Sequence, residues 1–130
     1  MASTAAATPV CFRLHVRPEL VPAYRERHAA VWPEMLRALA ETGWLDYRIF
    51  VADDGTCIGT FRTYDLDASL AGMASRDVNA RWQAEMQPFF AGLERPADES
   101  FELIPLAFDL DAQLAALEPT GAALDPHPRS

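Results

Sequence analysis

The spacing of polar and apolar residues changes along this chain. Residues 10–17, VCFRLHVR, carry an apolar side chain at every second position, which is typical of a β-strand with one buried face. From Pro18 to about Thr42 the apolar residues recur every three or four positions, which indicates an amphipathic helix, and Gly43 suits the end of that helix. The first predicted elements are therefore a strand and a helix.

The predicted helix contains Pro33. A proline inside a helix removes the hydrogen bond to the carbonyl four residues earlier, here that of Ala29, and its ring clashes with this carbonyl. We therefore expect the helix to kink or to restart near Trp32.

A β-hairpin is predicted after this helix. Residues 44–52 and 56–64 are rich in β-branched and aromatic side chains, as strands are. Asp53, Asp54 and Gly55 lie between them and favour a tight turn.

Helical spacing then returns up to about Phe90. Asp65 or Asp67 can cap a first helix, and Ser75 and Asp77 offer a new N-cap further on. We therefore expect two short helices in tandem.

The last part of the chain is predicted to form a loop, a strand and a tail. Residues 92–98, GLERPAD, are predicted to be a loop, and residues 100–110, SFELIPLAFDL, the last strand. Residues 111–130 alternate proline, alanine and acidic residues without a core pattern, although residues 112–118 can form a short helix.

The order strand, helix, strand, strand, helix, strand predicts an α+β fold, namely a ferredoxin-like βαββαβ antiparallel sheet with its helices on one face. We expect residues 10–110 to form this domain, residues 1–9 a flexible N-terminal segment and residues 111–130 a C-terminal tail.

In the last strand, apolar side chains point to both faces of the sheet. The face without helices would be buried if two copies packed sheet against sheet, so a homodimer is expected. These side chains are Phe101 and Leu103 on one face and Ile104, Leu106 and Phe108 on the other.

The charge of the chain disfavours two kinds of partner. Its 130 residues include 19 acidic and 11 basic side chains, a net charge of −8, and the basic residues are scattered. Such a protein repels a phosphate backbone and an anionic bilayer, so neither nucleic acid nor a membrane is an expected partner.

No segment has the apolar length of a membrane span, and residues 1–9 lack the features of a signal peptide. A cytoplasmic location is therefore expected.

The residues that commonly bind metals are dispersed. Cys11 and Cys57 lie far apart in strand-like segments, and the three histidines have no thiol or carboxylate at ligand spacing. We expect free thiols and no metal site.

His28 is the candidate for proton chemistry. It follows Tyr24 by four residues, so both side chains lie on the helix face that also carries Val31 and Met35. One interpretation is a half-buried histidine that hydrogen-bonds a carbonyl or Tyr24. The other is a general acid–base group, since a histidine pKa near 6.5 suits proton transfer at neutral pH.

Tyr47 has the same strand parity as Leu45 and Ile49, so it points to an apolar face that the helix can share. A pocket of Tyr24, His28, Tyr47 and Trp82 would combine flat apolar rings with hydroxyl groups. This combination suits a sugar.

From Val10 to Phe108 the chain resembles the L-rhamnose mutarotases, a family of small dimeric α+β-barrel proteins that interconvert pyranose anomers. The resemblance is strongest in YRERHAAVWPEM, DYRIF and DVNARWQAEMQP. It implies that His28 is the proton donor and that Tyr24, Tyr47 and Trp82 hold the substrate, without any cofactor. The chain departs from the family pattern in two places, because Gln83 replaces the second of two adjacent tryptophans and Ala29-Ala30 replace Asn-Pro.

The leading hypothesis is therefore a cofactor-free isomerase that interconverts the α and β anomers of a 6-deoxyhexose such as L-rhamnose by acid–base ring opening. Two alternatives stay open, because fold does not fix function. One is a cofactor-free monooxygenase or cyclase of the dimeric α+β-barrel class. The other is a non-catalytic small-molecule-binding protein.

Overall fold

The structure is a computed structural model that describes residues 7–90 and 101–117. Four antiparallel strands form one sheet in the order β2-β3-β1-β4. Their bounds are β1 Thr8–His15, β2 Leu45–Val51, β3 Thr56–Thr63 and β4 Glu102–Leu103. This order is that of a ferredoxin-like sheet, as the sequence predicts.

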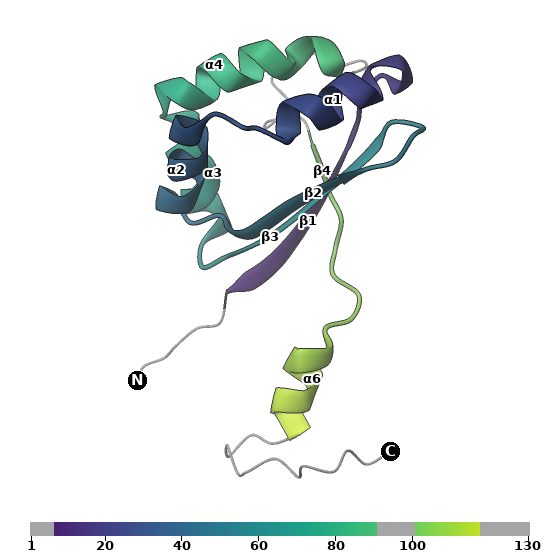
Figure 1. The fold of residues 1–130 in the computed structure, drawn as a ribbon. Helices are drawn as coiled ribbons and strands as arrows, with labels where there is room; N and C mark the ends of the chain where they lie inside the picture. Colours follow the sequence, from purple (N-terminus) through teal and green to yellow (C-terminus); the bar gives the residue numbers. More distant parts are fainter. Residues whose placement is uncertain (1–6, 91–100, 118–130) are drawn as a thin grey trace.

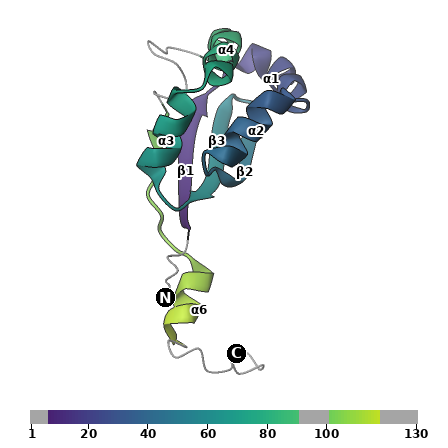
Figure 2. The ribbon, with the colours of Figure 1, turned by 90° about the vertical axis from the view of Figure 1, so that its left-hand side faces the viewer.

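The helices of the domain cover one face of the sheet, as Figures 1 and 2 show. They are α1 Val21–His28, α2 Pro33–Glu41, α3 Leu66–Ala74 and α4 Asp77–Met86, with the short 3-10 helices η1 Pro18–Leu20 and η2 Gln87–Phe89. The prediction of an α+β fold with its helices on one face is therefore confirmed.

The first predicted helix is indeed divided. α1 ends at His28, and α2 begins at Pro33. The proline occupies the first position of α2, where its missing N–H leaves no intrahelical hydrogen bond unmade. Gly43 follows α2 with a φ of +91°, the left-handed conformation that glycine adopts without strain.

The hairpin and the tandem helices also form as predicted, with one correction at a helix cap. Asp65 caps α3 by accepting a hydrogen bond from the Ala68 N–H at 3.1 Å. The N-cap of α4 is Arg76, which lies between the two predicted caps, Ser75 and Asp77, and makes no side-chain capping bond. Ser75 instead ends α3.

The last strand is much shorter than predicted. Only Glu102 and Leu103 pair with β1, opposite Arg13 and Phe12. The Ile104 N–H still bonds the Cys11 carbonyl at 2.8 Å, but Pro105 has no N–H with which to extend the ladder. The predicted loop at residues 92–98 lies outside the described residues.

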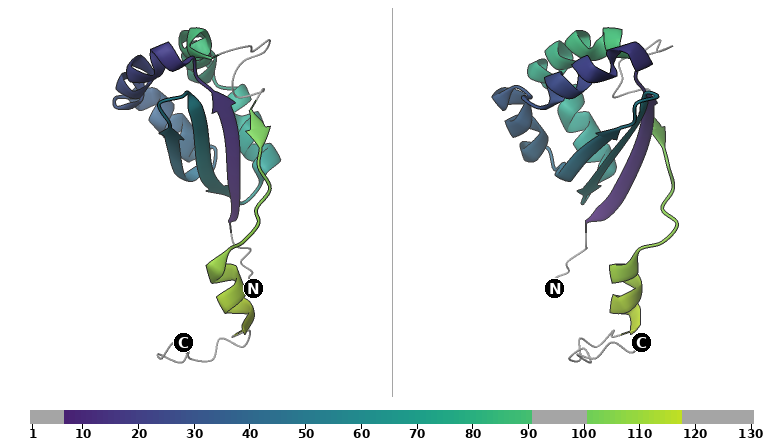
Figure 3. Two further views of the ribbon diagram at one scale, coloured as in Figure 1. Left: turned by 90° about the vertical axis from the view of Figure 1, so that its right-hand side faces the viewer. Right: turned by 45° about the vertical axis from the view of Figure 1, so that its right-hand side comes forward.

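Beyond β4 the chain leaves the domain and ends in α6, Leu110–Leu117, which projects away from the sheet (Figure 3). This helix begins two residues before the one expected at residues 112–118. Leu106 and Phe108, on the connecting segment, are 61% and 63% exposed. Among the described residues, no helix is long and apolar enough to cross a membrane.

The hydrophobic core lies between the sheet and the four helices. Its centre is aromatic: the Phe12 ring covers Gly59 of β3 so closely that a Cβ there would stand 2.1 Å from the ring. Phe61 stacks on Trp44 with ring centroids 4.2 Å apart. This aromatic layer forms the floor of the candidate site.

Candidate active site

His28 is the last residue of α1 and is half-buried. Its Nδ1 lies 3.0 Å from the Tyr24 carbonyl oxygen. A carbonyl only accepts hydrogen bonds, so Nδ1 is the donor, and in the neutral ring the lone pair sits on Nε2. The packing interpretation of His28 is thus correct in part, because the ring does bond a carbonyl, and that bond leaves Nε2 for chemistry.

Burial lowers the pKa of His28 below its ordinary value of 6.5, and the bond to the Tyr24 carbonyl opposes this shift. Removal from water disfavours the charged imidazolium. The ring is therefore mainly neutral at pH 7, and its protonated form gives up its proton more readily than an exposed histidine does.

Tyr24 supports His28 from the preceding turn of α1. Its ring lies 4.1 Å from the imidazole, centroid to centroid, and only 3% of the residue is exposed. Its hydroxyl is 3.4 Å from the Cys57 Sγ, within hydrogen-bond distance. Burial and the neighbouring thiol raise the pKa of Tyr24 far above its ordinary range, so its hydroxyl stays protonated.

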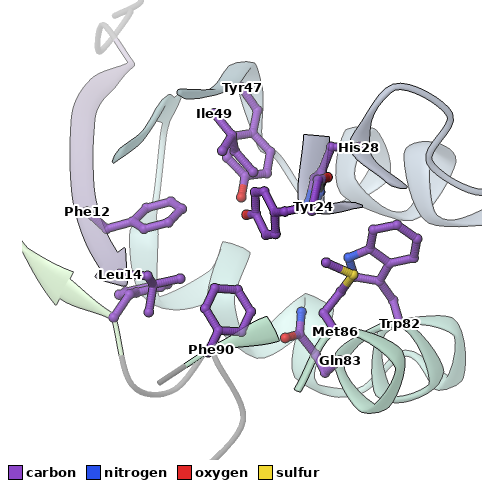
Figure 4. A pocket seen from close by; sticks show the side chains of 11 residues that line it. Phe12, Leu14, Tyr24, His28, Tyr47, Ile49, Trp82, Gln83, Met86 and Phe90 are labelled. Carbon is purple, nitrogen blue, oxygen red and sulfur yellow. Dashed lines mark hydrogen bonds between the residues drawn. The ribbon is translucent and has the colours of Figure 1, made fainter. Parts of the chain in front are cut away.

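Tyr47 and Trp82 complete the predicted set from two other elements, β2 and α4. The Trp82 ring meets His28 edge to face at 5.6 Å and is buried. Tyr47 is half-buried, and its ring lies 6.2 Å from that of Phe12. Figure 4 shows all four predicted side chains around the same space.

Two hollows meet at these side chains. The smaller has a volume of about 60 Å³ and the larger about 310 Å³. The larger lies at the lower end of the range usual for small-molecule sites, whereas the smaller has room only for a few waters. The two hollows share the wall residues His28, Tyr47, Ile49, Trp82 and Gln83. Of the four predicted site residues, only Tyr24 is confined to the smaller hollow.

The sequence analysis did not identify several residues that line the larger hollow. Asn79 is one of them, and it lies four residues before Gln83, which the sequence analysis named as a departure from the family pattern. A polar residue at this spacing from Gln83 on α4 was the signal that could have found Asn79. Trp44, Met35 and Met73 close its apolar part.

Exposed ion pairs hold α4 against the two other helices that form the walls. Arg81 of α4 bonds Glu34 of α2 at 3.1 Å, and Arg27 of α1 bonds Glu85 of α4. Exposed pairs of this kind add little to stability, typically about 0 to 1 kcal/mol each. Both pairs join α4 to a helix that contributes wall residues to the larger hollow.

The described part of the chain contains no group of three or more histidine, cysteine or acidic side chains that could hold a metal ion. Cys11 and Cys57 are both free thiols. Among the described residues, the polar groups that line the two hollows include the His28 imidazole, the hydroxyls of Tyr24 and Tyr47 and the amides of Asn79 and Gln83.

The fold and the site define a ferredoxin-like protein with a small-molecule hollow beside a titratable histidine. A sequence model of the L-rhamnose mutarotase family matches residues 9–110. An L-rhamnose mutarotase of Burkholderia cenocepacia is 37% identical over 95 residues, which cover 72% of this chain and 91% of the relative. That of Sinorhizobium fredii is 33% identical over 97 residues, covering 73% and 88%.

The fold has relatives among solved structures as well. The crystal structure of an L-rhamnose mutarotase from Formosa agariphila superposes with a TM-score of 0.60 at 22% identity, covering 78% of this chain and 94% of that one. A protein of Mycobacterium tuberculosis superposes with a TM-score of 0.52 at 18% identity, covering 80% and 98%. The chain belongs to the L-rhamnose mutarotase family, an isomerase family.

Proposed function

We propose that this protein is a mutarotase that interconverts the α and β pyranose anomers of a 6-deoxyhexose such as L-rhamnose. Family membership supports the reaction class. The observation that carries the proposal is the His28 imidazole, held through Nδ1 by the Tyr24 carbonyl, in the wall of a hollow of about 310 Å³.

His28 acts in this proposal as the acid. Its imidazolium gives the Nε2 proton to the ring oxygen, the bond between that oxygen and the anomeric carbon breaks, and the anomeric hydroxyl loses its proton as the carbonyl forms. Rotation about the bond beside the carbonyl presents its other face, and the reverse steps then close the ring as the other anomer. General acid–base help of this kind is typically worth about 10² to 10⁴ in rate.

The proton from the anomeric hydroxyl passes to Tyr47 or to a water molecule. Tyr24 is less suited to this step, because its hydroxyl is engaged with Cys57 and its pKa is raised. Tyr24 acts instead as a positioning residue, through its ring and its carbonyl. Trp82 offers an apolar surface on which a sugar face can stack.

The proposal is tested by NMR saturation transfer between the two anomers of L-rhamnose. Addition of the protein should raise the exchange rate above the uncatalysed rate in the same buffer, in proportion to its concentration. Exchange at the uncatalysed rate with L-rhamnose and with other 6-deoxyhexoses would contradict it.

We also propose that the protein is a homodimer in which the sheet faces without helices pack together. Phe50, whose strand parity is opposite to that of Tyr47, is 58% exposed on this face. A hollow of about 360 Å³ lies between β1, β3 and the segment that leaves β4, and Cys11 and Thr60 are among its wall residues. An exposed aromatic side chain on a sheet face that no helix covers is typical of a self-association surface.

The proposed location is the cytoplasm. Both Cys11 and Cys57 are free thiols, and a reducing compartment preserves that state. Cell fractionation with an antibody against the protein tests this, and recovery from an extracellular or membrane fraction would contradict it.

A further inference from the structure

The hollow beside His28 contains an amide pair that the proposed reaction does not use. Asn79 is only 5% exposed, and Gln83 is half-buried one turn later on α4. The Gln83 Nε2 donates to the Asn79 Oδ1 at 3.2 Å. Both residues line the larger hollow, and Gln83 lines the smaller one too.

These two amides are polar groups in a hollow whose wall is otherwise mostly apolar. Apart from His28 and Tyr47, its other wall residues are aliphatic, sulfur-containing or indole side chains. In such hollows a small number of placed polar groups fixes the orientation of a ligand. The amide end of Gln83 is turned toward the rings of the site in Figure 4.

A primary amide has two N–H donors and a carbonyl that accepts two hydrogen bonds. The bond to Asn79 uses one donor of Gln83. The carbonyl oxygen and the second N–H are then available to a group that both accepts and donates, which is what a hydroxyl does. A methyl group in the same place would leave these polar atoms without partners, which costs free energy in a site closed from water.

The position of His28 limits which substituent of the sugar is near these amides. If His28 acts on the ring oxygen, the wall around it faces the two carbons bonded to that oxygen. One of them carries the anomeric hydroxyl, which every aldose has. The other carries a methyl group in a 6-deoxyhexose and a hydroxymethyl group in an ordinary hexose.

We infer that Asn79 and Gln83 form a subsite for the hydroxymethyl group of a hexopyranose, so that the substrates of this enzyme include hexoses with a 6-hydroxyl. The inference rests on the proposed mutarotase function. L-mannose is the matched probe, because it is L-rhamnose with one oxygen added at carbon 6.

The test compares kcat/KM for L-mannose and L-rhamnose anomer exchange in the wild type, in Gln83→Met and in Gln113→Met. Methionine has nearly the size of glutamine but lacks the amide. Gln113 is an exposed glutamine of α6, outside both hollows, and serves as the matched control. Each rate is corrected for uncatalysed exchange, and circular dichroism checks that each variant is folded.

We expect wild-type kcat/KM for L-mannose to equal or exceed that for L-rhamnose. The ratio of L-mannose to L-rhamnose should fall about tenfold in Gln83→Met, a change of about 1.4 kcal/mol, and stay at the wild-type value in Gln113→Met. Because each ratio is taken within one protein, a general loss of activity does not alter it.

Exchange of L-rhamnose together with an unchanged ratio in Gln83→Met would overturn the subsite and leave the mutarotase proposal standing. Exchange of L-rhamnose without exchange of L-mannose by the wild type would do the same. Failure of the wild type to speed exchange of either sugar would overturn both proposals.

Discussion

At the scale of single residues, the contacts of His28 suit the proton transfer that we propose for it. The Tyr24 ring lies against one side of it, and the Tyr24 carbonyl holds Nδ1 at 3.0 Å. These contacts fix the tautomer and the orientation of the imidazole before a substrate binds. A preorganised group loses little conformational freedom in a reaction, so this arrangement favours the acid role that we propose for His28.

The lowered pKa of His28 predicts a pH dependence of activity. Because the proposed acid is the protonated ring, kcat/KM for L-rhamnose anomer exchange should rise as the pH falls from 8 and should level off below a pKa that is lower than 6.5. NMR exchange rates at constant ionic strength, corrected for buffer catalysis, give this profile. A kcat/KM that falls as the pH decreases from 7 to 5.5 in the folded protein would show that the neutral ring acts instead, as a base.

The same shift predicts a pH dependence of stability. The pKa of His28 is lower in the folded protein than in the unfolded chain, where it is about 6.5. Between these two values the unfolded chain binds more protons, so the free energy of unfolding should decrease as the pH falls through this window. Urea unfolding at pH 7.5 and pH 5.5 measures the decrease.

His28→Gln should remove part of that decrease, while His15→Gln serves as the matched control at an exposed position on β1. An equal pH dependence of unfolding in the wild type and in His28→Gln would contradict the burial argument.

At the scale of elements, the break between α1 and α2 positions the site. Pro33 prevents one continuous helix, so α1 ends at His28 and the chain turns before α2 begins. Val31, in this turn, and Met35, in the first part of α2, line the larger hollow together with His28. The wall of the site is therefore built from both sides of the break.

Gly59 is predicted to be essential to the packing of β3 against β1. A Cβ at this position would stand 2.1 Å from the Phe12 ring, which is 3% exposed and also stacks on Phe101. Overpacking of this kind typically costs about 1 to 3 kcal/mol. Gly59→Ala should therefore lower the free energy of unfolding in urea by that amount.

Thr60→Ala is the control for this prediction, because Thr60 is the next residue of β3 and has the opposite strand parity. Equal unfolding free energies for Gly59→Ala and the wild type would mean that the Phe12 ring can move aside without cost.

The sequence pattern predicted an element well where neighbouring residues alone determine it. Strict alternation predicted a strand at residues 10–17, where β1 covers Thr8–His15. Pro33 predicted the break, and Asp65 was one of the two residues predicted to cap α3. The predicted length of the last strand was wrong because pairing with β1 determines it. Apolar residues continue beyond Leu103, but Pro105 has no N–H to donate to the ladder with β1. The spacing of apolar residues along one strand does not determine where its pairing with the neighbouring strand ends.

The candidate site was predictable to a similar extent. The spacing of Tyr24 and His28 placed them on one helix face, and they do lie against each other. The resemblance marked Gln83 as a departure beside Trp82, but Asn79 was missed because its place in the wall depends on what α4 faces across the hollow. The engagement of the Tyr24 hydroxyl with Cys57 joins α1 to β3, and no sequence spacing predicts such a contact.

At the scale of the whole molecule, the sheet separates a packed face from an exposed one. The core and both hollows at the site lie on the helix side. On the described parts of the chain, exposed apolar side chains gather beyond Leu103. They are Leu106, Phe108, Leu110, Leu114 and Leu117, each at least 45% exposed. A second copy of the chain can cover this segment together with the open face of the sheet.

The proposed homodimer predicts a dimer mass in sedimentation equilibrium. Replacing Phe50 and Phe108 by serine should shift the protein toward the monomer, because both side chains would be buried between the copies. Leu36→Ser is the control, since Leu36 is 53% exposed on the helix side. A monomeric wild type at micromolar concentration, or a double variant as dimeric as the wild type, would contradict this arrangement.

The proton transfer assigned to His28 is tested most directly by His28→Asn, with His15→Asn as the control. Asparagine keeps a polar side chain but cannot carry a proton between pH 5 and 8. With both variants folded, NMR saturation transfer on L-rhamnose should show the catalysed rate reduced about 10² to 10⁴-fold in His28→Asn and unchanged in His15→Asn. A catalysed rate in His28→Asn within a few-fold of the wild type would show that another group moves the proton.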